Sequence, residues 1–299
     1  MTAQLFDTGS GKENHSQTLK KIIDSRQTTA IAGAYDGMSA LLAARSGFRA
    51  LYLSGAALSA SMALPDLGLL TLDDVRHAAR TMVMASKLPV IVDCDTGFGE
   101  ILNVMRAVRD LEDAGVACIQ IEDQILPKKC GHLNDKRIAP IDDMCRKITA
   151  AKKASRNLCV CARTDAAQFS LEDAIERANR YTDAGADIIF VEALHQREHM
   201  ERVRSEVSAP LLANMTEFGR TPQTSLTDWE ALGYELVIFP VSAFRVASRA
   251  MERFYESLRK NGDVSEFLPE MMTREELYDR IRYFDYEELD DSIARSTIP

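Results

Sequence analysis

The stretch DAGVACIQIE, residues 113–122, decides the fold. Small residues and a glycine end an amphipathic segment, and an aliphatic run that closes on a carboxylate follows within a few positions. Glycine just past a helix takes the left-handed cap, and a continuous apolar run is typical of a parallel strand buried on both faces. The stretch therefore predicts a helix-to-strand junction of a repeating β-α chain.

The same junction recurs in ARSGFRALYLS at residues 44–54, DAGADIIFVE at 183–192 and LGYELVIFP at 232–240. Further strands are predicted at residues 29–32, 89–93, 158–163 and 210–214. Together these runs alternate with helices in the way of a closed (β/α)8 barrel of the TIM type. A doubly wound open sheet is the alternative, but it more often carries a GxGxxG turn after its first strand, and none follows residues 29–32.

The 299-residue length suits one barrel with additions. We predict a loose N-terminal arm over residues 1–16 and a catalytic barrel over residues 17–260. Residues 261–299 are predicted to form a C-terminal helical extension, in which TREELY at 273–278 has the acidic first turn of a helix start. Such a long extension either packs on a neighbouring subunit or covers the barrel surface.

The amino-acid composition limits the classes of molecule that the protein is expected to bind. The 36 Lys and Arg against 45 Asp and Glu give a net charge of -9, which argues against a nucleic-acid surface. The six cysteines form no CxxC pair, so we expect them to be reduced. No apolar run approaches the ~18 residues that a membrane span needs. We expect a cytoplasmic enzyme that acts on small molecules, with no nucleic-acid or membrane partner.

Polar residues end nearly every predicted strand. Active sites of (β/α)8 barrels are assembled where the carboxyl ends of the strands meet, so this pattern indicates an enzyme. The residues at these positions are Ser54, Asp93, Asp95, Glu122, Arg163, Glu192, Asn214 and Arg245.

Asp93 and Asp95 are the candidate metal ligands. They lie two apart as a strand ends, and the glycines of GFG at residues 97–99 let the backbone fold close to what they hold. Carboxylate oxygens completed by water suit Mg²⁺, or Mn²⁺, better than zinc, and Asp66 and Glu122 are placed to anchor such waters. Aspartates that cap helices or form ion pairs are the alternative interpretation.

The segment KKCGH, residues 128–132, has the composition of a reactive loop. Neighbouring cations stabilise a thiolate, so the sequence predicts a pKa for Cys130 well below that of a free cysteine. The alternative interpretation is a solvent-exposed basic loop whose cysteine has no catalytic role. Another is a hydrolase in which Cys130 is the nucleophile and His132 the base.

The substrate is predicted to carry two or three carboxylates. Arg163, Arg245 and Arg274 offer planar forks for carboxylates, and Ser54, Asn214, Thr216 and the backbone of Gly55 supply neutral hydrogen bonds. With a metal to polarise a 2-oxo acid and a cysteine to donate a proton, the natural reaction is aldol-type C–C cleavage. Tyr52, two residues before Ser54, is the predicted general base. A non-catalytic dicarboxylate binder is a further alternative.

Several separated segments resemble the isocitrate lyase and phosphoenolpyruvate mutase superfamily. The KKCGH loop carries the resemblance, and YLSG, LPDLG, DCDTGFG, IEDQ, ARTD, NMTEFG and SAFR extend it over residues 52–245. The chain looks most like the methylisocitrate lyase branch. Isocitrate lyases share Lys129 but are usually longer through insertions that are absent here.

The resemblance implies Mg²⁺-dependent cleavage of 2-methylisocitrate to pyruvate and succinate, a step of propionate breakdown. Activity on 2,3-dimethylmalate or isocitrate is the alternative, and a phosphonate-processing mutase is a more distant one. The resemblance also implies a homotetramer in which the eighth helix is swapped between subunits. It places Lys128, Cys130 and His132 in catalysis and implies substrate contacts from Ser54, Gly55, Ala56, Gly131, Arg163, Glu192, Asn214, Met215, Thr216, Arg245 and Arg274.

Overall fold

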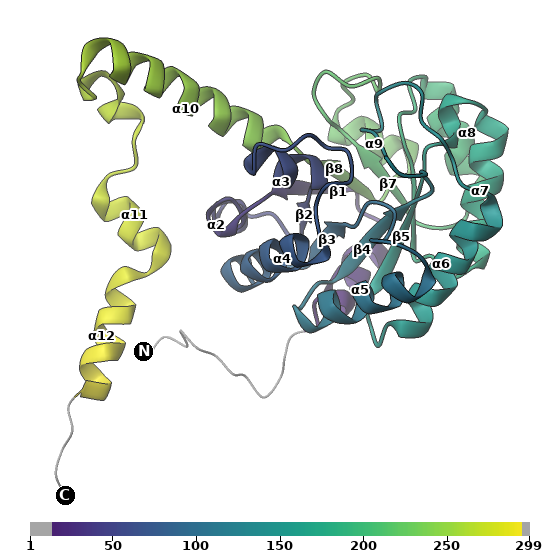
Figure 1. Cartoon of the computed structure of the whole chain (residues 1–299), viewed down its shortest axis with the longest axis horizontal. Coiled ribbons are helices and arrows are strands. Elements are labelled where there is room, and N and C mark those ends of the chain that lie inside the picture. Colours follow the sequence, from purple (N-terminus) through teal and green to yellow (C-terminus); the bar gives the residue numbers. More distant parts are fainter. Residues whose placement is uncertain (1–13, 295–299) are drawn as a thin grey trace, which may run out of the picture. The chain divides into compact units, whose positions relative to one another are not determined.

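The computed structural model describes residues 14–294 of the chain. These residues form two compact units, Asn14–Arg245 and the residues from Val246 onward. The first unit is a closed barrel whose strands β1 to β8 pair in parallel and in sequence order (Figure 1). The predicted (β/α)8 architecture is confirmed.

All the strands lie where the apolar runs predict them, with ends that differ by one or two residues. They are β1 (Thr29–Ala34), β2 (Leu51–Leu53), β3 (Val90–Asp93), β4 (Cys118–Glu122), β5 (Cys159–Thr164), β6 (Ile188–Val191), β7 (Leu211–Asn214) and β8 (Leu236–Phe239).

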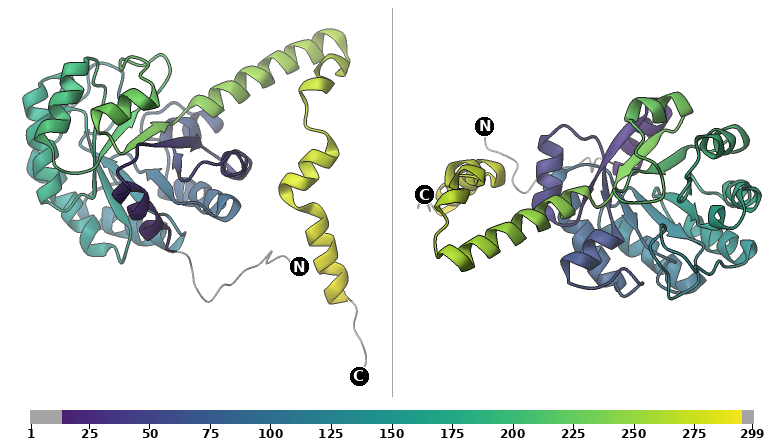
Figure 2. Two further views of the ribbon diagram at one scale, coloured as in Figure 1. Left: turned by 180° about the vertical axis from the view of Figure 1, so that it is seen from behind. Right: turned by 90° about the horizontal axis from the view of Figure 1, so that it is seen from above.

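Helices follow the strands and surround the barrel (Figure 2). None of the described helices is long and apolar enough to cross a bilayer. The helices are α1 (His15–Asp24), α2 (Gly37–Arg45), α3 (Gly55–Ser61), α4 (Leu72–Ser86), α5 (Ile101–Asp113), α6 (Ile141–Ala154), η1 (Ala166–Gln168), α7 (Leu171–Asp183), α8 (Arg197–Glu206), α9 (Leu226–Leu232), α10 (Ser242–Asn261), η2 (Ser265–Glu270), α11 (Arg274–Ile281) and α12 (Tyr283–Ala294).

The helix ends follow local sequence signals. Gly185 and Gly233 have φ values of 107° and 79°, which a residue with a Cβ adopts only under strain, so each ends its helix where a strand must begin. At the other end, Thr71 and Asp74 form a reciprocal capping box that starts α4.

The barrel interior is filled by alternate residues of the strands. Ile31, Ile91, Cys161, Phe190 and Leu236 belong to one buried cluster, as expected when every second side chain points inward. Helix α1 contributes to the same cluster, and its Ser16 donates a hydrogen bond at 3.0 Å to the carbonyl of Ala117, which precedes β4. Helix α1 therefore closes the barrel at the amino ends of the strands, opposite the predicted site.

The predicted domain boundaries need one adjustment. The barrel unit ends at Arg245, earlier than the predicted boundary at residue 260, because α10 beyond its first turn belongs to the terminal unit. The predicted arm over residues 1–16 lies for the most part outside the described residues, and α1 begins within it at His15.

Candidate active site

The site residues lie at the carboxyl ends of the strands, two positions after the side chains that fill the barrel interior, and they face inward like them. Two residues after the apolar Ile91, Cys161 and Phe190 come Asp93, Arg163 and Glu192, and Gln120 is followed in the same way by Glu122. Since side chains two apart share a face of a strand, these four charged groups point into the same end of the barrel. All of them are buried.

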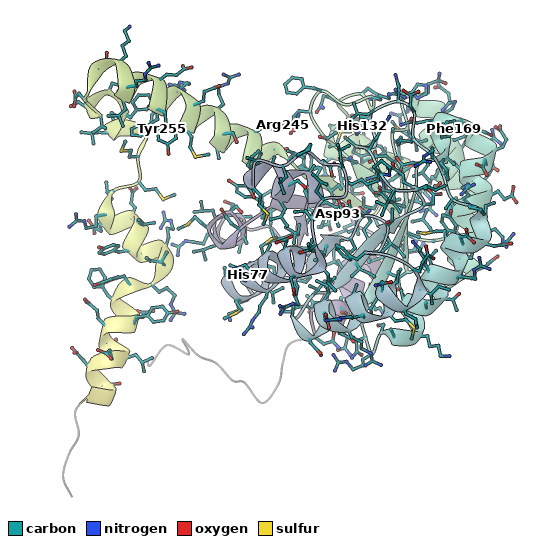
Figure 3. The ribbon with its side chains drawn as sticks, in the orientation of Figure 1. His77, Asp93, His132, Phe169, Arg245 and Tyr255 are labelled. Atoms are coloured by element: carbon teal, nitrogen blue, oxygen red, sulfur yellow. The ribbon has the colours of Figure 1, made fainter. Side chains whose placement is uncertain are left out.

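The two predicted metal ligands lie together at the end of β3 (Figure 3 labels Asp93). Asp93 Oδ2 accepts a hydrogen bond at 3.2 Å from the backbone N–H of Gly55, and its Oδ1 accepts bonds from the Asp95 N–H at 3.2 Å and Gln120 Nε2 at 3.4 Å. A Cβ on Gly55 would lie 3.0 Å from Asp93 Oδ2, so the glycine gives the backbone this close approach. Burial, reinforced by the neighbouring Asp95, raises the pKa of Asp93 to about 6.

The donor set fits a hard divalent cation. Both oxygens of Glu122 are buried without a hydrogen bond, and burial raises its pKa well above the usual value although Arg163 opposes the shift. Buried carboxylates this close to one another are stabilised by an added positive charge, and oxygen ligands are those that Mg²⁺ prefers. Among the described residues no three His, Cys, Asp or Glu side chains converge as a ready cage, so waters would have to complete the coordination of Asp93 and Asp95.

A cleft of about 460 Å³ opens beside these carboxylates. Asp95 and Thr96 line it together with Gly68, Leu72 and Leu126. Of the candidate metal ligands, Asp95 lines this cleft.

Lys128 faces these acids and not the thiol of Cys130. Its ammonium group forms ion pairs with Asp66 and, at 2.7 Å, with Asp95 Oδ1. Burial lowers the pKa of Lys128, but the surrounding carboxylates, Glu122 and Asp95 foremost, outweigh burial and raise the pKa. Asp66, predicted to act through water, thus contacts the site through Lys128.

The predicted low pKa of Cys130 is wrong. Burial of the half-buried thiol raises its pKa, and Glu192 adds to the shift, while the backbone N–H of His132 and the Arg163 guanidinium work against it. The prediction counted Lys128 and Lys129 as neighbours of the thiol, but Lys128 binds carboxylates and Lys129 Nζ donates to the carbonyl of Asn134 at 3.3 Å. Cys130 is therefore a protonated thiol at neutral pH.

The residue after Cys130 lies directly on the charged layer. A Cβ added to Gly131 would lie 2.4 Å from Glu192 Cγ and 2.6 Å from Arg163 Nη2. Arg163 Nη1 in turn lies 3.3 Å from oxygens of both Glu122 and Glu192. The Cys130 loop is thus seated on Glu192 and Arg163, and Arg163 connects it to Glu122 of the candidate metal site.

His132 joins this loop to the one after β7 (Figure 3 labels His132). Its Nδ1 accepts a hydrogen bond at 2.9 Å from the backbone N–H of Arg220, and its Nε2 lies 3.6 Å from Glu192 Oε1. Because Nδ1 is an acceptor, the neutral ring carries its proton on Nε2, which faces Glu192. Burial lowers the pKa of His132, with Arg163 and Lys136 acting in the same direction.

Tyr52 does not suit the predicted role of general base. It is 2% exposed inside the barrel and donates its hydroxyl proton to Gln120 Oε1. Burial first, and then Asp93, raise its pKa well above the usual value. A phenol that keeps its proton so firmly is a poor base.

The other predicted substrate contacts divide into two groups. Asn214 Nδ2 lies 3.3 Å from Glu192 Oε2 and the Gly55 N–H binds Asp93, so these two border the charged layer. Ser54 accepts a hydrogen bond from the Ala57 N–H at 3.3 Å and caps α3, so its substrate contact and that of Ala56 stay predictions. The side chain of Met215 is buried in the apolar cluster outside the barrel, so its predicted contact is corrected to the backbone at most.

Thr216 and Arg245 lie near the mouth. Thr216 is buried directly after β7, and Arg245, exposed at the start of α10, donates to the carbonyl of Glu217 at 2.7 Å (Figure 3). Arg274 is exposed in the terminal unit, so its substrate contact stays a prediction.

The structure adds site residues that the sequence patterns did not indicate. They are Gln120, Lys136, Asp165, Gln168 and Arg220. Asp165 had a signal, because it lies two residues beyond Arg163 and so shares its face. Lys136 follows the polar residues Asn134 and Asp135, which gives no sign in the sequence that the structure buries it.

A family model described as phosphoenolpyruvate phosphomutase matches residues 19–259. The chain belongs to the PEP mutase/isocitrate lyase superfamily. The superfamily resemblance predicted from the KKCGH loop is confirmed.

Three relatives show how far this superfamily likeness extends. A 2-methylisocitrate lyase from Bacillus subtilis (strain 168) is 47% identical over 97% of each chain. The crystal structure of a 2,3-dimethylmalate lyase, a PEP mutase/isocitrate lyase superfamily member, is 34% identical with a TM-score of 0.88 and covers 94% of this chain and 95% of its own. A phosphonopyruvate hydrolase solved with oxalate and Mg²⁺ is 28% identical with a TM-score of 0.83, over 94% of this chain and 98% of its own.

Proposed function

We propose that the protein is a Mg²⁺-dependent carbon–carbon lyase that cleaves 2-methylisocitrate to pyruvate and succinate. The observation that carries the proposal is the seating of the Cys130 loop: Gly131 lies on Arg163 and Glu192, while Lys128 of the same loop pairs with Asp95 at 2.7 Å. One loop therefore brings a proton donor, Cys130, and a cation paired to the candidate metal ligand Asp95 to the same charged layer. The 47% identity to a 2-methylisocitrate lyase supports the choice of substrate.

Asp93 and Asp95 would hold the metal, with Glu122 nearby to orient its waters. When bound, Mg²⁺ would stabilise the charge that develops on the oxygens of the 2-hydroxy acid half of the substrate, which becomes the 2-oxo acid pyruvate. The oxygen-only donor set supports this choice, and so does the Mg²⁺ in the crystal structure of the phosphonopyruvate hydrolase complex. Mn²⁺ fits the same ligands.

A residue of the chain, Cys130, can supply the proton that the leaving fragment needs to become succinate. A base takes the substrate hydroxyl proton, the C–C bond breaks, the carbonyl of pyruvate forms, and the electron pair of the broken bond stays on a carbon of succinate. Cys130 then donates its proton to that carbon. The raised pKa of Cys130 serves this step, because the thiol must be protonated when the carbanion forms. Arg163, with its planar guanidinium, would hold a substrate carboxylate beside the loop.

The hydrolase alternative is not supported by the same geometry. A cysteine nucleophile needs a base that takes its proton. The Nδ1 of His132 is occupied by the Arg220 N–H and its Nε2 faces Glu192, so neither ring nitrogen is directed to that task.

The test is a substrate panel. Purified protein is assayed for pyruvate release from 2-methylisocitrate, 2,3-dimethylmalate and isocitrate, with Mg²⁺ and after EDTA treatment. We expect the highest kcat/KM on 2-methylisocitrate, loss of turnover in EDTA, and recovery on adding Mg²⁺. A higher kcat/KM on 2,3-dimethylmalate would reassign the substrate within the superfamily, and tight binding without turnover on any of them would favour a dicarboxylate binder.

We further propose a homotetramer in which α10 is exchanged between subunits. Helix α10 has no buried residue within the chain, and Val246, Met251 and Tyr255 are 72%, 48% and 62% exposed (Figure 3 labels Tyr255). Exposed apolar side chains on one long helix are typical of a surface that packs on another subunit. Light scattering should give four times the monomer mass, and a monomer would refute the exchange.

The six cysteines are all free. Reduced thiols support our proposal of a reducing compartment, the cytoplasm.

A further inference from the structure

The backbone carbonyl of Gly131 is held by two side chains from outside the KKCGH segment. Lys136 Nζ and Gln168 Nε2 both donate hydrogen bonds to it. A carbonyl oxygen has two lone pairs, so its acceptor capacity is filled. Gln168 comes from η1 after β5, and Lys136 from the returning part of the loop, so the two donors anchor Gly131 to different parts of the barrel.

The ammonium of Lys136 is anchored in turn by a buried ion pair. It pairs with Asp165 Oδ1, and the side chains of both residues are fully buried. Arg163 binds the same carboxylate through Nε at 2.9 Å and Nη2 at 3.0 Å. Burial raises the pKa of Asp165, but Arg163 and Lys136 outweigh it, so the pKa is lowered and the carboxyl stays ionised. The loop carbonyl is thus connected to Arg163 through Lys136 and Asp165, by three charge-assisted contacts in series.

The opposite side of Gly131 is fixed as well, because its Cα rests on Glu192 and Arg163. The residue next to Cys130 is therefore held from two sides. A buried ion pair seldom adds net stability over well-packed apolar groups of the same volume, so stability is a weak reason to keep Lys136 here. Fixing the position of the neighbouring thiol is a stronger one.

We propose that Lys136 and Gln168 are positioning residues that hold Cys130 over the charged layer through the Gly131 carbonyl. Neither touches the thiol in this arrangement. The proposal rests on the proposed function only where it takes Cys130 as the proton donor.

The experiment measures the alkylation rate of Cys130 by iodoacetamide in the full-length protein with Mg²⁺ and no substrate, followed by peptide mass spectrometry. Gln168→Leu removes one neutral donor and should raise the rate about fivefold, and Lys136→Met removes a charged donor and should raise it about tenfold or more. Both should lower kcat by similar factors with KM changed less than about twofold, because the metal and carboxylate contacts remain.

Lys152→Met is the matched control. It breaks the ion pair of Lys152 with Asp187, 2.7 Å long, on α6 and away from the loop. Its Cys130 should react as in the parent protein. The half-buried Cys145, also on α6, reports general loosening in every variant.

Unchanged Cys130 alkylation in a folded Gln168→Leu variant would overturn the proposal, as would equal acceleration at Cys130 and Cys145 or acceleration in Lys152→Met. If Lys136→Met fails to fold, Gln168→Leu carries the test alone, since it buries no unpaired charge. If the parent shows no turnover on the substrate panel but the loop variants still accelerate Cys130 alkylation, the proposed function fails and the positioning role stands.

Discussion

The interior of the barrel and its rim are built by the same strands but carry opposite chemistry. Ile91 and Asp93, Cys161 and Arg163, or Phe190 and Glu192 are only two residues apart, and every member of these pairs is buried. The first residue of each pair belongs to one apolar cluster. Of the second residues, Arg163 and Glu192 form an ion pair, and Asp93 accepts hydrogen bonds from Gly55, Asp95 and Gln120. One step along a strand therefore separates side chains that stabilise the fold from side chains that cost free energy to bury.

This difference predicts which substitutions should change the free energy of unfolding and which should change turnover. Substitutions in the interior are expected to change the free energy of unfolding and leave the chemistry of the remaining folded molecules intact. Substitutions at the rim are expected to change turnover, with little loss of stability where they leave no buried charge without a partner.

Cys130→Ser should show the largest effect. The hydroxyl is a far weaker acid than the thiol, so kcat should fall roughly 1,000-fold, within the range of a lost general acid, with the thermal midpoint unchanged within ~2 °C. Stopped assays of pyruvate release and thermal unfolding measure the two quantities. Cys145→Ser on α6 is the control and should keep parental turnover. Turnover close to that of the parent in Cys130→Ser would remove the thiol from the mechanism.

Leu236→Ala should show the reverse pattern. Leu236 is fully buried in the interior cluster, so the substitution should lower the free energy of unfolding by about 3 kcal/mol through lost burial and a residual cavity. Denaturant titration measures the loss, and kcat per folded molecule should stay within about twofold.

Leu102→Ala is the matched control for this experiment. Leu102 is 79% exposed on α5, and its truncation should change stability by less than about 0.5 kcal/mol. Equal losses at Leu236 and Leu102 would contradict the assignment of stability to the barrel interior.

The pH dependence of Cys130 alkylation tests the raised pKa at the rim. Only the thiolate reacts, and a raised pKa keeps the thiolate fraction small at neutral pH. The rate should therefore rise about tenfold per pH unit from pH 7 to pH 9 without levelling off. A plateau below pH 8 would restore the low pKa that the sequence alone suggests. A Cys145→Ala background removes the other half-buried thiol from the measurement.

Tyr52→Phe should have the smallest effect, because Tyr52 sits on the border between the two layers. The lost hydrogen bond leaves Gln120 Oε1 unsatisfied, which should cost about 1–2 kcal/mol of stability. The kcat should fall less than about fivefold, whereas loss of a general base costs roughly 100-fold or more.

Tyr181→Phe is the control for that variant. Its hydroxyl donates to Asp123 Oδ2 at 2.8 Å in an equally buried setting, on α7 outside the barrel. The two variants should lose similar stability, and a much larger loss of kcat in Tyr52→Phe alone would reinstate Tyr52 as the base.

The fold could be predicted from the sequence because the signals are local. The continuous apolar runs and the glycines at 115, 185 and 233 mark where strands begin, and pairing in sequence order follows for a β-α repeat. The carboxylates at 93 and 95 were found for the same reason, since residues at the ends of parallel strands meet at one rim.

The electrostatics of the rim could not be predicted in the same way. The pKa of Cys130 depends on where two neighbouring ammonium groups point, and Lys128 points to Asp66 and Asp95, which are distant in the sequence. Likewise, the burial of Lys136 follows from its ion pair with Asp165, which lies directly after β5. Side-chain partners of this kind are set by tertiary contacts that no local pattern contains.

The missing side chain of Gly131 has one more consequence. Even the single methyl group of alanine would collide with the Glu192 and Arg163 side chains, so any other amino acid here would displace the loop from these two side chains. In a library randomised over the segment, active clones should retain glycine here without exception while the exposed Leu133 two places on drifts freely. Gly131, the smallest residue of the segment, is thus one of the positions least able to accept another side chain.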